Sequence, residues 1–170
     1  MTPATRSRSY TSFDSTSVDK YNRFIRPYIG SRIPFVRFDT TASVENIPDL
    51  LLFIDQACHS YTLPRPLCLE LRLAVEEACV NIIKHGYAGL QPGKIMIDFQ
   101  RHENQVIITI TDFGREFDPN NYPPPDNSSD WDQRPVGGQG VFLLTKIMDN
   151  VRYTSNQGQG NQLELIKRIK

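Results

Sequence analysis

The sequence lacks several features that would each point to a particular class of protein. It has no excess of either charge, because 19 basic and 19 acidic residues cancel, so its composition gives no general attraction to nucleic acid or to an anionic membrane. Its three cysteines form no Cys-x-x-Cys pair, which favours reduced, buried thiols. It also has no signal-peptide pattern and no apolar stretch long enough for a membrane span, and we therefore expect a cytoplasmic protein.

The chain is predicted to consist of a short extension followed by one domain. A length of 170 residues is enough for one domain with its own core. Residues 1–33 are rich in Ser, Thr, Arg and Tyr and show no stable period, so we interpret them as a flexible N-terminal extension. They are either an unselected solvated tail or a basic arm for a partner protein. Residues 34–170 are predicted to form the folded domain.

Hydrophobic periodicity predicts a strand and two helices in the first half of this domain. A short β-rich run begins at Phe35, and apolar residues at three- and four-residue steps predict a helix over residues 44–61. The clearest helix begins after the breakers Pro64 and Pro66 and ends at Gly86.

The second half is predicted to be richer in strands. Alternating runs at residues 94–100 and 105–113 predict an antiparallel hairpin. Residues 115–140 are too polar and too long for an ordinary connector, and we expect a lid there. A helix over 141–148 and closing strands at 151–153 and 163–169 complete the pattern of an α+β two-layer sandwich.

The long helix carries a carboxylate and a carboxamide one turn apart. Glu77 and Asn81 share a face, Ala74 and His85 extend that face, and Glu76 lies on another one. The amide oxygen is a hard ligand for Mg²⁺, and the carboxylate can accept a proton from an attacking hydroxyl. Glu and Asn on a helix usually face solvent, so the pair alone is also explained by exposure.

Two further polar side chains follow on the same segment. Lys84 can reach a phosphate, although a solvent-exposed lysine explains it as well. His85 is either a site residue or a residue favoured at a helix end by the dipole.

The hairpin's second strand ends in an Asp-x-Gly sequence. The carboxylate of Asp112 can accept a hydrogen bond from an amino group, and Gly114 lets a flat ring approach the backbone. Both features suit an adenine, and we include Phe117 from the same segment in the predicted nucleotide site. The competing interpretation is a simple strand terminator.

A glycine-rich segment runs directly into the last predicted helix. Gly137, Gly138 and Gly140 precede or begin a helix that continues from Val141. Their N–H groups and the positive end of the helix dipole suit a triphosphate, whereas a flexible hinge is the alternative.

Three segments together resemble the N, G1 and G2 boxes of the GHKL ATPase superfamily, in order and in spacing. They are EACVNIIKHGY, TDFGREFDP and GGQGVFLLTKIMD. More narrowly, the chain looks like the anti-sigma factor serine/threonine kinases of the RsbW type, and the resemblance extends from about Phe35 to the C-terminus.

The resemblance implies a fold, an activity and a set of partners. The fold is a Bergerat-type ATP-binding domain, with a mixed, mostly antiparallel sheet covered by helices on one face. Members bind Mg·ATP, phosphorylate a serine or threonine of a STAS-fold antagonist, sequester a sigma factor, and often form homodimers. By position, Glu77 corresponds to the general base, Asn81 to the Mg²⁺ ligand, and Asp112 with Gly114 to the adenine site.

The chain departs from the family pattern at several positions. Gly138 and Gly140 take the phosphate-binding positions, and Gln139 stands between them at a position where members usually carry an apolar residue. Some members carry an arginine just ahead of these glycines, whereas this chain has Val136 there. As a hypothesis, Arg134 substitutes for that arginine.

A further departure lies before the last strand, where Gly160-Asn161 stands in place of Gly-Thr. This change affects the expected final contact on the phosphate side. The proline-rich sequence YPPPDNSSDWDQRP in the lid matches no family pattern.

Three functions are compatible with this sequence. The first is a protein kinase, and the second is a regulator that docks on a partner in an ATP-dependent way without phosphorylating it. The third, the ATPase half of a histidine kinase, is disfavoured because no dimerisation helix with a phosphoacceptor histidine precedes the domain.

Overall fold

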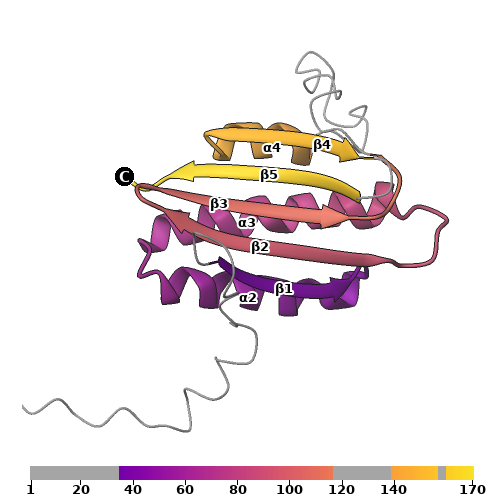
Figure 1. Cartoon of the computed structure of the whole chain (residues 1–170), viewed down its shortest axis with the longest axis horizontal. Coiled ribbons are helices and arrows are strands. Elements are labelled where there is room, and N and C mark those ends of the chain that lie inside the picture. Colours follow the sequence, from indigo (N-terminus) through magenta and orange to yellow (C-terminus); the bar gives the residue numbers. More distant parts are fainter. Residues whose placement is uncertain (1–34, 117–138, 157–159) are drawn as a thin grey trace, which may run out of the picture.

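The sheet carries the helices on one of its faces (Figure 1). The computed structural model describes residues 35–116, 139–156 and 160–170. Within these residues, five strands pair in the order β1-β2-β3-β5-β4. Every pair is antiparallel. The predicted two-layer sandwich is therefore confirmed.

The strands and helices follow the predicted order. The strands are β1 (Phe35–Thr41), β2 (Lys94–His102), β3 (Gln105–Asp112), β4 (Asn150–Asn156) and β5 (Gly160–Arg168). The helices are α2 (Ile47–Ser60), α3 (Arg65–Asn81) and α4 (Gln139–Ile147). A 3₁₀ turn (Val44–Asn46) precedes α2, and a π-helical turn (Ile82–Gly86) follows α3.

The core lies between the sheet and the helices because alternate side chains of each strand point inward. On β3 the inward side chains are Val106, Ile108 and Ile110, all fully buried. A fully buried aliphatic or aromatic side chain of this size contributes about 1.5–3 kcal/mol relative to exposure. The inward-facing row of β3 therefore has a strong reason to remain apolar, and any polar residue in it requires a separate explanation.

Helix α3 lies between α2 and α4 and contacts both. Its regular α-helical part ends at Asn81, and the next turn is wider, because Tyr87 N donates to Ile82 O at 3.1 Å, five residues earlier. The sequence predicted one continuous helix to Gly86, so this turn is a correction. π-helical turns often occur at functional sites, and this one directly follows the Asn81 position.

Most of the other predicted boundaries are confirmed to within a few residues. The last helix begins at Gln139 and not at Val141, and the two closing strands are longer than predicted. The N-terminal extension and most of the predicted lid lie outside the described residues. Cys58 and Cys79 are buried free thiols as expected, whereas Cys68 is only half-buried. No helix in the described ranges is long and apolar enough to cross a bilayer.

A lysine joins three elements beside the last helix. Lys167 Nζ on β5 lies 2.8 Å from Glu70 Oε2 on α3, and it also donates to Ile147 O at the end of α4. Because cations are favoured at the carboxyl end of a helix, this contact anchors the C-terminal end of α4 against α3 and the sheet.

Tyr87 joins the end of the long helical segment to the ends of two strands. Its hydroxyl donates to Lys94 O at 3.1 Å and accepts a hydrogen bond from Phe113 N at 3.0 Å. A Cβ on Gly93 would lie 2.6 Å from this ring, so the glycine makes room for the tyrosine. The Tyr87 hydroxyl therefore ties the start of β2 and the residue after β3 to the same side chain.

We predict that Tyr87→Phe lowers the free energy of unfolding by about 1–2 kcal/mol, because it leaves two backbone groups without their partner. Chemical denaturation monitored by circular dichroism would measure the change. An unchanged denaturation midpoint would contradict this role of the hydroxyl.

Candidate functional site

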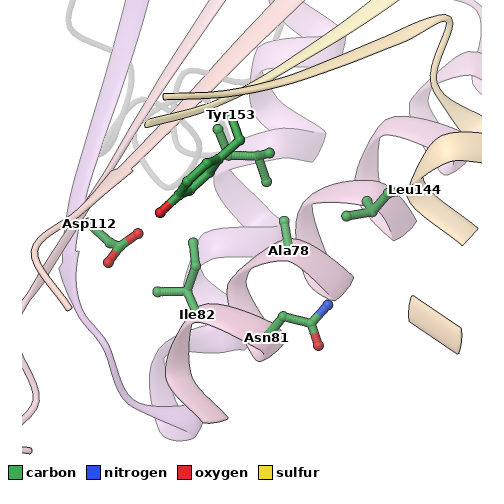
Figure 2. A pocket seen from close by; sticks show the side chains of 7 residues that line it. Ala78, Asn81, Ile82, Asp112, Leu144 and Tyr153 are labelled. Atoms are coloured by element: carbon green, nitrogen blue, oxygen red, sulfur yellow. The ribbon is translucent and has the colours of Figure 1, made fainter. Parts of the chain in front are cut away.

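A narrow recess opens where α3, α4 and the sheet meet. Its free space, open solvent included, is about 290 Å³. Only about 10 Å³ of this space is enclosed, far less than the roughly 300–1,000 Å³ of most small-molecule sites, so a nucleotide base enters only if the side chains around the recess move apart. Its lining residues, six of them labelled in Figure 2, are Ala78, Asn81, Ile82, Asp112, Leu144, Tyr153 and Leu163.

Asp112 is the buried acid of this recess. It continues the inward-facing row of β3 and is only 5% exposed. Its Oδ1 accepts hydrogen bonds from Gly114 N at 2.8 Å and from Asn161 Nδ2 at 3.2 Å. Neither bond uses Oδ2, and Figure 2 shows the carboxylate directed into the space between β4 and α3. One carboxylate oxygen is thus held by the protein, and the other is available to a ligand.

The environment of Asp112 opposes its ionisation. Burial raises the pKa of this carboxyl above its usual value, while the hydrogen bonds from Gly114 and Asn161 act in the opposite direction. A carboxylate buried among apolar side chains is costly for folding, so stability does not explain why Asp112 stands here.

Asn81 lies at the other end of the recess from Asp112 (Figure 2). Its Nδ2 is buried and has no hydrogen-bond partner among the described residues. A buried polar atom without a partner costs about 1–3 kcal/mol, and a ligand that recruits the amide would recover part of that cost. The orphaned amide therefore fits a site that is completed by another molecule.

A backbone contact joins the end of the π-helical turn to the turn after β3. Arg115 N donates to Gly86 O at 2.7 Å. A Cβ on Gly114 would lie only 2.6 Å from Gly86 O, so no other residue fits at Gly114 without a shift of the backbone. The sequence attributed this glycine to the approach of a flat ring, whereas in the structure it permits the contact with Gly86.

Asn161 was not among the residues predicted for the adenine side of the site. It is the cross-strand partner of Asp112 on β5, and its amide contacts that carboxylate. The resemblance implied a phosphate-side contact at position 161, and the structure places the Asn161 side chain against Asp112. A signal for its burial was present in the sequence, because Asn161 alternates in phase with the buried residues Leu163 and Leu165.

The apolar walls of the recess were also missed. Tyr153 on β4 pairs directly with Leu163 on β5, and its hydroxyl points toward the Asp112 carboxylate (Figure 2). Ala78, Ile82 and the fully buried Leu144 face the same space. Sequence alone marks such residues as core, because an apolar wall of a site and a core position share the same periodicity.

Glu77, Lys84 and His85 do not line the recess. Glu77 is half-buried on α3, one turn before Asn81. Lys84 and His85 are exposed on the π-helical turn. Gly140 and Val141 belong to the first turn of α4.

Three predicted site residues, Phe117, Gly137 and Gly138, fall outside the described residues, as does Arg134. In the described part of the chain no group of three or more His, Cys, Asp or Glu side chains is arranged to hold a metal ion.

Residues 40–167 match the family described as "Histidine kinase-like ATPase domain". This match spans most of the chain, including α3, β3 and α4. The chain belongs to this family. The two-layer fold of the described residues agrees with this assignment.

Two relatives within this family illustrate the branch. Serine-protein kinase RsbW of Listeria monocytogenes is 30% identical over 93 residues, which are 52% of this chain and 59% of the relative. Serine-protein kinase RsbW of Bacillus thuringiensis is 33% identical over 93 residues, which are 52% of this chain and 58% of the relative. The predicted resemblance to the RsbW branch is confirmed, over somewhat more than half of the relatives' length.

We predict that Asp112→Asn separates stability from nucleotide binding. Because burial raises the folded-state pKa of Asp112, the folded protein holds the proton more tightly than the unfolded chain. This contribution to stability is complete below the unfolded-state pKa and is lost as the pH rises through the folded-state pKa. The asparagine side chain introduced by this substitution keeps the shape of the aspartate and one acceptor oxygen, but it removes the buried negative charge.

At pH 7 the Asp112→Asn protein should therefore melt at the same temperature as the wild type or higher, while its affinity for ATP falls at least about tenfold. Thermal melts and titration calorimetry would measure the two effects. A variant that is less stable but binds ATP normally would show that this carboxylate is only structural.

Proposed function

We propose that this chain binds Mg·ATP at the recess and acts as a serine/threonine protein kinase of the anti-sigma type. It would phosphorylate a STAS-fold antagonist, sequester a sigma factor, or do both in a partner switch. The observation that carries the proposal is that a buried acid from β3 lines one recess with a carboxamide from α3 whose nitrogen has no partner among the described residues. The relatives named serine-protein kinase support the same conclusion.

The base of the nucleotide would lie against Asp112. Its Oδ2 can accept a hydrogen bond from the exocyclic amino group of adenine. The ring would be enclosed by apolar side chains of three elements, Ile82 after α3, Leu144 on α4 and Leu163 on β5. This combination of an apolar enclosure and a few fixed polar groups is typical of small-molecule sites.

The metal and the phosphates would lie beyond the base, toward Asn81. The amide oxygen of Asn81 would hold Mg²⁺ together with phosphate oxygens, which is the usual arrangement for this ion. When bound, the ion supplies neutralisation of the charge that develops on the transferred phosphoryl group. The chain's own contribution is to orient the nucleotide between Asp112 and Asn81.

Glu77 would act as the general base of the transfer. It lies one turn before Asn81 on α3 and is half-buried, so it is accessible from outside the recess. A carboxylate there can accept the proton of a partner's serine or threonine hydroxyl as the oxygen attacks the γ-phosphorus. The acceptor would come from the partner protein and not from this chain.

We predict that Glu77→Gln lowers the rate of phosphate transfer to a STAS-fold substrate by about 100- to 10,000-fold, while ATP affinity changes little. Radiolabelled ATP, the purified chain and candidate STAS-fold proteins would provide the measurement. Glu76→Gln is the matched control, because Glu76 is also half-buried but lies on another face of α3. The rate of phosphate transfer by this variant should equal that of the wild type.

Equal rates for wild type and Glu77→Gln would refute the general-base assignment. If the partner binds only in the presence of ATP and gains no phosphate, the chain is an ATP-dependent docking module.

We also predict that Asn81→Ala removes most of the Mg²⁺-dependent part of ATP affinity, a loss of roughly tenfold. Calorimetric titrations with and without Mg²⁺ would separate the Mg²⁺-dependent part of the ATP affinity from the part that does not need the ion. Affinity without Mg²⁺ should be nearly unchanged in this variant, whereas Asp112→Asn should weaken both. An equal Mg²⁺ effect in wild type and Asn81→Ala would show that Asn81 is not a metal ligand.

A further inference from the structure

Asn161 forms an unusually dense set of polar contacts at the edge of the recess. Its side chain is almost fully buried, with the residue only 4% exposed. The amide nitrogen donates to Asp112 Oδ1 at 3.2 Å, to Gly114 O at 3.1 Å and to Arg115 O at 3.4 Å. A single amide therefore contacts the buried carboxylate and the two carbonyls of the turn that follows it.

These contacts determine which way the amide faces. All three neighbours of Nδ2 are oxygens that act as acceptors when the carboxyl is ionised. A flipped amide would place its oxygen against three oxygens and would lose every hydrogen bond. The amide nitrogen is thus fixed toward Asp112 as a donor.

The backbone of β5 brings Asn161 to this position. Gly160 has a φ of +88°, and a Cβ there would lie 2.6 Å from Asp112 O. Only glycine allows the strand to begin so close to the end of β3. Gly160 therefore allows β5 to approach the end of β3, and this approach places Asn161 beside Asp112.

The network extends to the beginning of the predicted lid. Ser155 on β4 is the cross-strand partner of Asn161, and its hydroxyl lies 3.1 Å from Asn161 Oδ1 and 2.6 Å from Glu116 Oε1. Since a hydroxyl donates one hydrogen, the shorter contact to Glu116 is the hydrogen bond. Asn161 is thus enclosed by polar groups on both sides and has little freedom to rotate.

We propose that Asn161 is a specificity-determining residue, which holds Asp112 as a pure acceptor so that the site selects a purine with a 6-amino group over one with a 6-oxo group. The proposal rests on the proposed nucleotide binding and adds the residue that sets its selectivity. Asn161 does not touch the base itself. It acts through the carboxylate that does.

The physical reason is the charge state of a buried acid. Two N–H donors on Oδ1 stabilise the ionised form, and the ionised Oδ2 attracts an amino group but repels a carbonyl oxygen. Without the Asn161 donor the carboxyl retains its proton more readily, and a protonated carboxyl can donate to a carbonyl. Cys79 and Tyr87 interact electrostatically with Asp112, and the Tyr153 hydroxyl points toward it; none of these groups is cationic.

The experiment compares the dissociation constants of ATP and inosine triphosphate, which carries a carbonyl at position 6. Titration calorimetry with Mg²⁺ at pH 7 would be performed on the full chain. The variants are Asn161→Ala, which removes the amide, and Asn161→Asp, which keeps its shape but replaces the donor with an acid. Gln162→Ala is the matched control, because Gln162 is the next residue of β5 and is exposed on the other face of the sheet.

We expect the wild type and Gln162→Ala to prefer ATP by about 100-fold or more. The preference should fall at least about tenfold in Asn161→Ala and approach equality in Asn161→Asp, in which two adjacent carboxyls share a proton. Thermal melts would establish that each variant is folded. If one of them does not fold, the other still provides the comparison.

Folded Asn161 variants that keep the wild-type preference for ATP would overturn the proposal and leave the proposed function intact. A wild type that binds both nucleotides equally would overturn it as well. A wild type that binds neither nucleotide would instead contradict the proposed function.

Discussion

The backbone contact between the end of the long helical segment and the turn after β3 is the constraint on which the candidate site depends. Arg115 N donates to Gly86 O at 2.7 Å, and Gly114 lies so close to Gly86 that a Cβ would not fit. Asn81 precedes one side of this contact and Asp112 precedes the other. Because the contact involves backbone atoms, it fixes the two segments more firmly than a pair of flexible side chains would, and the recess between them follows from it.

The site is built from groups that are locally unfavourable. Asp112 is a buried carboxyl with its pKa raised by desolvation, and Asn81 carries a buried nitrogen without a hydrogen-bond partner in the described residues. An apolar side chain at either position would serve folding better. Proteins commonly retain such costs where function requires them. The rest of the inward-facing row of β3 is apolar, so stability is supplied by its neighbours while Asp112 remains available for binding.

The fold could be predicted because alternation and helical periodicity are strong in this chain, as on β3, where Val106, Ile108 and Ile110 mark the buried face. Asp112 and Asn81 were predicted because each stands in a motif whose chemistry is recognisable from residue type. Tyr153 and Leu144 were missed because an apolar wall has no periodicity of its own. The π-helical turn was missed too, since the segment from Ile82 to Gly86 reads as an ordinary helix end. The contact of Asn161 with Asp112 could not be read from the sequence, because it depends on how β5 pairs with β3.

The order of polar groups along α3 gives the proposed site a direction. Ile82 borders the recess beside Asp112, Asn81 lies at its other end, and Glu77 is one turn further toward the start of the helix. A helix rises 1.5 Å per residue, so the step from Asn81 to Glu77 is about 6 Å along the helix axis. A nucleotide with its base at Asp112 would therefore extend along the helix toward Glu77, outside the recess. A general base in that place can meet a hydroxyl presented by another protein, whereas a base inside the recess would be closed off by the nucleotide itself.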